Sequence, residues 1–436
     1  MKRSFQPTQY QLQSVEGGDM FNDSGWILDA PAAQSPSLIR AIYADQQLHL
    51  LDDSHGLYKF ASWLPVKRML KGSSAPVTYK SVGLAEYLGL KNLYITFSGY
   101  WPEKAAGMKT CSFKETEAYS VCGRMDFKNG EVLVVASAGN TARAFAQVCS
   151  DNQIPLLLCV PYDNVDALWF EAPLNPCVKL ACTESGSDYF DAINLSNMVC
   201  KMEGFVAEGG AKNIARRDGM ATTMLSATTF IGRVPDVYFQ AVGSGTGAIA
   251  AWEANLRLIA DGRFGNTKMK LLVSQNIPFI PMYNAWKADS RQILPFDDDE
   301  ARKQVEEIVA KVLSNRKPPY AITGGLYDAL KDTNGDVLLA TNEEAKFATD
   351  LFRNLEGIDI HPAAAIATAT LINAVKNQSI DLDSVIMLNI TGGGEEKFKA
   401  DHEVYYLEPD FIFPISLSFE EIEVEIRKAR FRIPLR

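Results

Sequence analysis

The chain has 436 residues, of which 47% are hydrophobic and 22% charged, a composition typical of a globular protein that buries a large core. This length predicts two lobes. With 53 acidic and 43 basic residues the net charge is −10, and no basic cluster stands out, so nucleic acid and anionic membranes are poor candidates as partners.

Cysteine and histidine usage predicts neither a metal site nor a disulfide framework. Seven cysteines and four histidines are scattered without a CxxC pair or the spacing of zinc ligands, so we expect reduced thiols in a cytoplasmic protein and no metal. The first residues carry no apolar segment typical of a signal peptide, and the longest apolar run, Ile154–Pro161, is too short to cross a bilayer.

Along the chain, residues 1–75 are rich in turn formers and predict a lead-in segment that wraps the main body. From Lys91 onward, short apolar runs predict strands buried on both faces of a mainly parallel sheet: residues 93–97, 131–136, 154–160, 178–182, 237–242, 269–273 and 385–389. Amphipathic segments between them predict helices, most clearly at 141–150, 189–202, 247–261 and 298–313. This alternation predicts an α/β fold.

Three loops follow predicted strands and carry glycine or hydroxyl groups. The run Gly243, Ser244, Gly245, Thr246 and Gly247 opens a helix, where backbone N–H groups and the helix dipole favour an anion such as a phosphate. The same residues also fit a dinucleotide fingerprint, but the next predicted strand runs into Ser-Gln-Asn at 274–276 instead of an acid. A purely structural tight turn is the third interpretation.

The other two loops are Ser137–Thr141 (SAGNT) and Thr391–Gly394 (TGGG). In the first, Ser137, Asn140 and Thr141 can cap a helix or contact a ligand. Because ligands of open α/β sheets bind at the carboxyl edge of the strands, all three loops are candidates for one common site.

Lys114, in the run Lys109–Lys114 (KTCSFK), supplies a reactive amine. A neutral lysine can form an imine with an aldehyde cofactor and can afterwards take a proton from a substrate carbon. Burial and a nearby cation both lower the pKa of a lysine toward the range where it is neutral. One lysine with a phosphate loop and polar ring contacts is the set that pyridoxal phosphate (PLP) requires.

These motifs resemble the fold-type II PLP enzymes, the group of tryptophan synthase β and threonine synthase. Ser-Phe-Lys at 112–114, Ser-x-Gly-Asn-Thr at 137–141 and the loop at 243–247 carry the resemblance, which runs from about residue 55 to 400. It implies a two-lobed fold with a lead-in at 1–75, a large PLP-binding domain at 76–126 and 210–436, and a smaller α/β domain at 127–209. It also implies a homo-oligomer.

The resemblance further assigns roles to individual residues. It implies that Lys114 binds the cofactor, that Asn140 contacts the ring hydroxyl, and that Gly243 to Gly247 hold the phosphate. Thr391 would face the pyridine nitrogen, and Ser137 with Thr141 would receive the substrate carboxylate.

Within this group the phrases at 99–104, 110–114, 135–140, 360–365 and 388–394 are most similar to the cysteate synthases, which use O-phospho-L-serine and sulfite. Lys114 is followed by Glu-Thr-Glu, where threonine synthases usually have Asp-Arg-Gly, and no cysteine-containing segment precedes residue 75. Threonine synthase, and a PLP-fold protein that binds without turnover, remain the alternatives.

Two anionic substrates require positive groups in an acidic protein. Lys104, Lys109 and Thr110, which lie just before Lys114, are the predicted ligands of the phosphate or sulfonate, and Arg143 and Arg216 are weaker candidates. His361 lies within one of the shared phrases, and we expect it to serve in packing.

Overall fold

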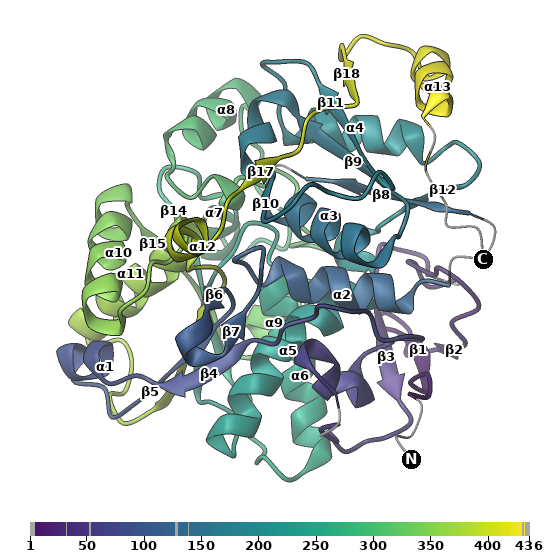
Figure 1. The fold of residues 1–436 in the computed structure, drawn as a ribbon. Helices are drawn as coiled ribbons and strands as arrows, with labels where there is room; N and C mark the ends of the chain where they lie inside the picture. Colours follow the sequence, from purple (N-terminus) through teal and green to yellow (C-terminus); the bar gives the residue numbers. More distant parts are fainter. Residues whose placement is uncertain are drawn as a thin grey trace.

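A computed structural model describes residues 5–31, 33–51, 54–126, 130–137, 139–429 and 431. Its larger sheet has six strands, and all neighbours pair in parallel except β4, which is antiparallel to β5 (Figure 1). In spatial order the strands are β15 (Asp336–Ala340), β14 (Lys270–Asn276), β13 (Val237–Ala241), β16 (Val385–Ile390), β5 (Asn92–Phe97) and β4 (Val77–Lys80).

The second sheet has five strands that all pair in parallel. Its order is β12 (Phe205–Ala207), β8 (Val132–Ala136), β9 (Leu156–Pro161), β11 (Val178–Thr183) and β18 (Phe411–Phe413). All seven predicted apolar runs form strands of these two sheets, as expected for segments buried on both faces.

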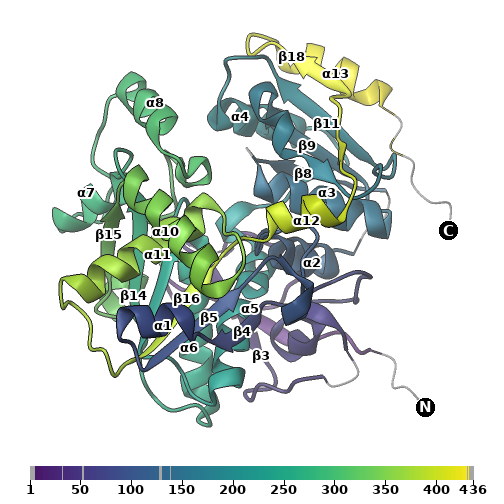
Figure 2. The same cartoon turned by 60° about the vertical axis from the view of Figure 1, so that its left-hand side comes forward.

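Helices cover both faces of each sheet because successive strand side chains point to opposite sides. In the six-stranded sheet, Tyr238 packs toward α5 (Ile214–Ile231), α6 (Thr246–Asp261) and α9 (Leu326–Asp332), whereas Phe239 packs toward α1 (Gly83–Leu88), α10 (Asn342–Glu356) and α11 (Pro362–Lys376). Figure 2 shows α10 and α11 over one face of this sheet.

The five-stranded sheet follows the same rule. Leu133 and Leu156 face α2 (Lys114–Arg124) and α3 (Asn140–Asn152), and Val134 and Leu157 face α4 (Tyr189–Val199) and α13 (Phe419–Lys428). The chain therefore has the predicted α/β architecture, with mostly parallel sheets flanked by helices.

Helix α2 lies between the two sheets. It contacts α3 on one side and α5 on the other, and α5 approaches closely because Gly219 has no side chain: a Cβ there would lie 2.4 Å from the carbonyl oxygen of Thr116. The first residue of α2 is Lys114, so the packing that joins the two sheets also fixes the position of this lysine.

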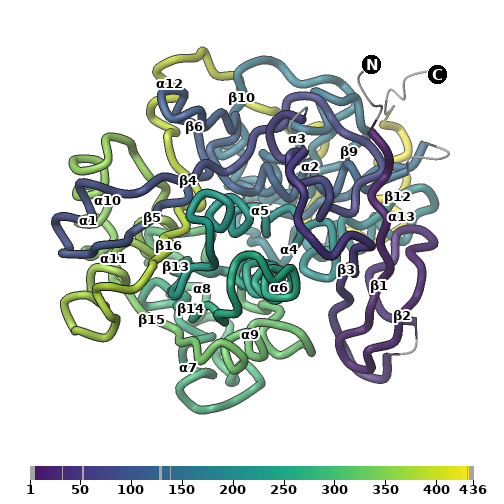
Figure 3. The backbone as a smooth tube through the Cα atoms, turned by 90° about the horizontal axis from the view of Figure 1, so that it is seen from below, coloured from purple at the N-terminus to yellow at the C-terminus, as the bar shows by residue number. Residues whose placement is uncertain are grey.

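The lead-in forms a three-stranded antiparallel sheet from β1 (Tyr10–Ser14), β2 (Met20–Phe21) and β3 (Ile39–Tyr43), followed by the 3₁₀ helix η1 (Gly56–Trp63). Figure 3 shows these strands beside α6. Leu12 and Ile39 share a core cluster with Ala250 and Leu258 of α6, so the lead-in is packed on the body of the protein.

Two details differ from the sequence predictions. The predicted helix at 298–313 ends early: α8 spans Asp298–Glu307, and residues 311–313 form a separate 3₁₀ turn. The reason is that the N–H groups of Val309 and Ala310 donate to the side chains of Asn342 and Asn276 instead of continuing the helix.

The C-terminal segment also crosses between the sheets. After α12 (Glu395–Asp401) it runs to β18, which completes the five-stranded sheet, and to α13, which packs on one face of that sheet (Figure 2). The predicted domain boundaries remain a prediction, but residues 411–428, which they place with the large domain, pack on the smaller sheet. The remaining α-helix of the described chain, α7, spans Pro281–Lys287. None of the helices that the structure describes is long and apolar enough to cross a membrane.

Candidate active site

One cavity lies where the carboxyl ends of strands from both sheets meet. Its lining combines the amine of Lys114 with residues of all three predicted loops, namely Ser137, Gly139, Asn140, Thr141, the whole run Gly243 to Gly247, and Thr391. Arg216, Tyr189, His361 and residues 311–315 also line the cavity. Segments that are up to 277 positions apart in the sequence, from 114 to 391, thus share one site, as the strand-edge argument predicted.

Hydrogen bonds tie the segment before Lys114 to the TGGG loop. The N–H of Phe113 donates to the carbonyl of Thr391 at 3.0 Å, and the N–H of Gly393 donates to the carbonyl of Cys111 at 3.0 Å. Cys111 has a φ of 52°, in the left-handed region that few residues other than glycine adopt. This turn directs the chain from the loop into α2 and presents Lys114 at the first position of the helix.

The side chain of Lys114 is mostly enclosed, with 20% of its surface exposed. Its Nζ lies 3.4 Å from Oε2 of Glu117, one helical turn further along α2. Burial lowers the pKa of Lys114, and the positive charge of Arg216 lowers it as well, against the opposing effect of Glu117. The amine is therefore closer to its neutral, nucleophilic form than an exposed lysine.

Arg216 is the cation that the cavity contains besides Lys114 and Lys311. Its Nη2 donates to Oε1 of Glu117 at 2.9 Å, and its Nη1 donates to Oε2 of Glu208 at 2.6 Å. Nη2 also lies 3.5 Å from the hydroxyl of Thr141, while Nε has no partner among the described residues. Arg216 is thus held beside the SAGNT loop with donor capacity to spare.

The glycine loop begins α6 in the geometry expected of an anion cradle. Gly245 is the N-cap, with a φ of 80° that only glycine adopts readily, and its missing Cβ avoids Leu326. The hydroxyls of Ser244 and Thr246 are 2.8 Å apart at the helix start. The 16-residue helix directs its positive dipole end at this loop.

Asn140 is oriented by Arg143, whose Nη2 donates to the Asn140 side-chain oxygen at 3.1 Å. Arg143 also donates to the carbonyls of Thr110 and Ala167 and lies over the ring of Trp169. Because its guanidinium is buried and used in these contacts, Arg143 supports the SAGNT loop and is not among the residues that line the cavity.

His361 also lines the cavity. Its ring packs where a Cβ of Gly392 would otherwise be, and its Nε2 lies 3.0 Å from Oε2 of Glu395. Burial raises the pKa of Glu395, but His361, Arg143 and Lys399 more than offset this and hold the pKa well below its usual value. We expected packing for His361, and the structure adds a close contact with the carboxylate of Glu395 at the cavity wall.

The three predicted anion ligands before Lys114 do not reach the cavity. Lys104 lies over the rings of Tyr79 and Trp101, on the outside of the protein. Lys109 is paired with Glu171. The N–H and hydroxyl of Thr110 both donate to Glu115 at 3.0 Å, which places this side chain in the support of the lysine segment.

Sequence reasoning did not name Glu117, Glu208 and Tyr189, and it gave Arg216 only as a weaker candidate, although Arg216 lines the cavity. Glu117 could have been found, because a residue three positions after Lys114 lies on the same face of a helix. No sequence signal marks residues 311–315, which reach the cavity only because they pack over the glycine loop.

The donor set of this cavity fits PLP. A desolvated amine, a glycine loop at a helix N-terminus and a strand-end hydroxyl in place of a carboxylate stand together around one space. The dinucleotide interpretation has less support, because Gln275 and Asn276 at the end of β14 use their side chains to hold backbone groups of Tyr283 and Ala310.

Residues 103–392 match the family model described as "Pyridoxal-phosphate dependent enzyme". Solved structures agree on the fold: maize serine racemase (TM-score 0.56, 15% identity, 75% of this chain and 91% of that one) and threonine deaminase isoform 2 of Solanum lycopersicum (TM-score 0.53, 14% identity, 74% and 87%). The chain is thus a PLP-dependent enzyme of fold type II.

The sequence comparison is more specific. The chain is 50% identical to the cysteate synthase of Methanosarcina mazei over 89% of its own length and 94% of that protein. It is 44% identical to the cysteate synthase of Methanospirillum hungatei over 97% and 98% of the two chains. This chain belongs to the cysteate synthase family.

Proposed function

We propose that the protein replaces the phosphate of O-phospho-L-serine with sulfite, giving L-cysteate and inorganic phosphate. The observation that carries this proposal is the joint placement of the Lys114 amine and the Arg216 guanidinium in one cavity, in a chain 50% identical to a cysteate synthase. The reaction needs a base that takes the proton from Cα and a cation that binds the two anionic reactants.

The residues predicted to hold the cofactor keep their roles in the proposal. The backbone N–H groups of Gly243 to Gly247 would hold its phosphate, Asn140 its ring hydroxyl, and Thr391 would face its ring nitrogen. When bound, PLP supplies an aldehyde for the substrate amine and a ring that draws electrons from Cα.

Lys114 has the acid–base role. Its Nζ takes the proton from Cα of the substrate, the Cβ–O bond breaks, and phosphate leaves with the electron pair of that bond. Sulfite then forms the Cβ–S bond through its sulfur lone pair, and Lys114 returns the proton to Cα. The lowered pKa of Lys114 favours the first of these transfers, because the amine must be neutral to accept a proton.

Ser137 and Thr141 would receive the substrate carboxylate at the start of α3. Arg216 lies 3.5 Å from the Thr141 hydroxyl, so an anion on Cβ of a substrate bound at this loop falls within its reach. We assign the leaving phosphate and the incoming sulfite to Arg216, in preference to Lys104 and Lys109.

Phosphate release tests the proposal. The enzyme loaded with PLP should release phosphate from O-phospho-L-serine and form L-cysteate only when sulfite is present, because sulfite completes the replacement. O-phosphohomoserine should be a poor substrate. Faster phosphate release from O-phosphohomoserine, with threonine as the product, would assign the chain to the threonine synthase reaction instead.

A further inference from the structure

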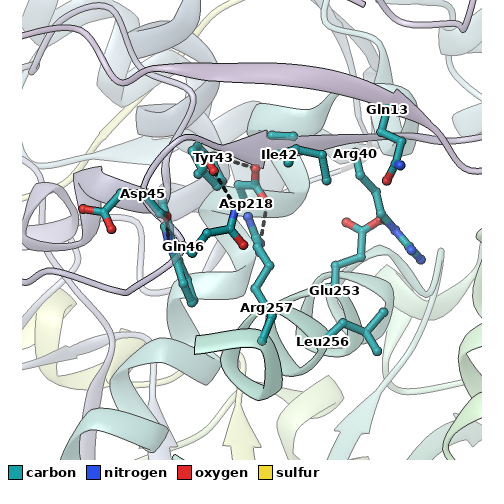
Figure 4. A pocket seen from close by; sticks show the side chains of 13 residues that line it. Gln13, Arg40, Ile42, Tyr43, Asp45, Gln46, Asp218, Glu253, Leu256 and Arg257 are labelled. Atoms are coloured by element: carbon teal, nitrogen blue, oxygen red, sulfur yellow. Dashed lines mark hydrogen bonds and ion pairs between the residues drawn. The ribbon is translucent and has the colours of Figure 1, made fainter. Parts of the chain in front are cut away.

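A second pocket lies between the lead-in and helices α5 and α6 (Figure 4), and among the described residues it shares no lining residue with the lysine cavity. Strands β1 and β3 and the turn after β3 form one wall, and α5 and α6 form the other. The polar lining residues are Gln13, Arg40, Tyr43, Asp45, Gln46, Asp218, Glu253 and Arg257, and Ile42, Trp63 and Leu256 add apolar surface.

Both carboxylates that α5 and α6 contribute to this pocket, Asp218 and Glu253, already accept two hydrogen bonds each. Glu253 accepts from Nε of Arg40 at 3.0 Å and from Nε of Arg217 at 2.8 Å. Asp218 accepts from Arg257 and from the hydroxyl of Tyr43, both at 2.6 Å (Figure 4). The pocket therefore has little acceptor capacity left for a metal ion or a simple cation.

The arginines, in contrast, retain unused donors. Nη2 of Arg40 and Nε of Arg257 are buried and have no hydrogen-bond partner within the described part of the chain. Arg40 is held over the ring of Trp252 and Arg257 between the rings of Tyr43 and Trp63. Buried N–H groups without partners are costly, so a ligand that supplies an acceptor, such as a carboxylate, is favoured here.

The charge balance restricts the ligand further. The lining contains two arginines, Arg40 and Arg257, and three carboxylates, Asp45, Asp218 and Glu253. A third arginine, Arg217, lies outside the lining and pairs with Glu253, which balances the charges of the whole cluster. An oxygen of Asp45 lies 3.2 Å from Nε2 of His49. A ligand with no net charge preserves this balance.

Amide oxygens can receive the positive end of such a ligand. Gln13 and Gln46 each use the side-chain nitrogen to donate to a backbone carbonyl, of Gly18 and Tyr43, which leaves the amide oxygens as acceptors at the rim. Donors for a carboxylate, acceptors for an ammonium group and an apolar wall for a side chain are thus present together.

We propose that this pocket is a second binding site, for a free α-amino acid. Its carboxylate accepts from Arg40 and Arg257, its ammonium group donates to the amide oxygens of Gln13 and Gln46, and its side chain packs on Leu256. The site is separate from the lysine cavity and does not depend on the reaction proposed above.

The location also connects the two sites. Asp218 in the pocket is two residues from Arg216 in the lysine cavity, on α5, and α6 carries Glu253 and Arg257 and begins at the glycine loop. A bound amino acid therefore contacts the two helices that position the proposed anion-binding groups. We expect it to shift the phosphoserine concentration for half-maximal rate at least twofold.

The test uses the PLP-loaded enzyme after borohydride reduction, which blocks amino acids from reacting at the lysine cavity. The probes are the common L-amino acids and L-cysteate, screened by thermal shift and then by calorimetry. At least one of these probes should bind the wild type. The same probe should bind at least tenfold more weakly to Leu256→Trp, in which the larger side chain fills the pocket, and to Arg40→Gln. Arg263→Gln, which alters a contact between the lead-in and the segment just after α6, should bind like the wild type.

Three results would overturn the proposal. The first is that no probe binds the reduced wild type. The second is that binding is unchanged in both pocket variants. The third is that the same compound without its amino group binds equally well, which would exclude recognition of a zwitterion. A ligand that binds in the pocket without shifting phosphoserine saturation of the unreduced enzyme would overturn the connection between the sites.

Discussion

At the scale of single residues, the proposed reaction depends on charged side chains that are largely buried next to one another. Lys114 is desolvated beside Glu117, and Arg216 joins Glu117 to Glu208 at the wall of the cavity. Sequence reasoning identified Lys114 from its motif but placed the anion site on the lysines just before it. The cavity lining does not include those lysines, whereas Arg216 reaches the cavity from α5, which is distant from Lys114 in the sequence but adjacent to α2 in the fold.

Substitution of Arg216 tests this assignment. Arg216→Gln should raise the KM for phosphoserine and for sulfite by about tenfold or more, since one charge-assisted hydrogen bond is worth on the order of 1.5–3 kcal/mol. Lys104→Ala and Lys109→Ala are the matched controls and should leave both constants unchanged, because their side chains lie outside the cavity. Steady-state kinetics that show the reverse pattern would restore the assignment to the lysines.

Glu115 makes the stability of the protein depend on pH. Burial raises its pKa to about 7, against the opposing effect of the Thr110 donors. Between pH 4.5 and 7 the folded protein keeps this proton while the unfolded chain releases it, so the free energy of unfolding falls as the pH rises, by about 3 kcal/mol at 1.4 kcal/mol per pKa unit.

Glu115→Gln removes this dependence and still accepts hydrogen bonds from Thr110. Denaturant unfolding at about pH 5 and pH 8 should show a smaller loss of stability in the variant than in the wild type. The exposed Glu420→Gln controls for the change in net charge. Equal pH dependence in wild type and Glu115→Gln would show that Glu115 ionises normally in the folded protein.

At the scale of elements, each functional loop joins a buried strand to a helix. This explains why the apolar runs and glycine loops could be predicted: a strand buried on both faces needs continuous apolar residues, and a turn with positive φ needs glycine. The end of α8 could not be predicted, because the acceptors that end it, Asn276 and Asn342, lie in distant segments.

The two glycines that flank α6 provide a matched pair of variants to test the role of the glycine loop. Gly245 at its start and Gly262 at its end have φ values of 80° and 79°, so alanine at either position costs about 1–2 kcal/mol of backbone strain. A Cβ at Gly245 would also lie 2.9 Å from Leu326, whereas at Gly262 it would meet nothing within 4 Å. Gly245→Ala should lose affinity for PLP, measured by equilibrium dialysis, and Gly262→Ala should not. Equal loss in both would mean that general destabilisation, and not the loop, is responsible.

At the scale of the whole molecule, the reaction site exists only because two sheets meet around α2. The chain crosses between them several times, and its C-terminal segment returns to the five-stranded sheet to form β18. The number of lobes and their α/β class followed from length and alternation, but this last crossing depends on tertiary packing of a three-residue strand, which is too short to carry a pattern of its own.

The central claim is that this assembly replaces phosphate by sulfite through a proton transfer at Cα. The most direct measurement is the mass of the product formed from O-phospho-L-serine and sulfite in D₂O. We predict L-cysteate that carries one carbon-bound deuterium, at Cα, since Lys114 removes a proton and returns one exchanged with solvent, and no product from Lys114→Ala. L-cysteate without deuterium, or a product without sulfur, would contradict the account.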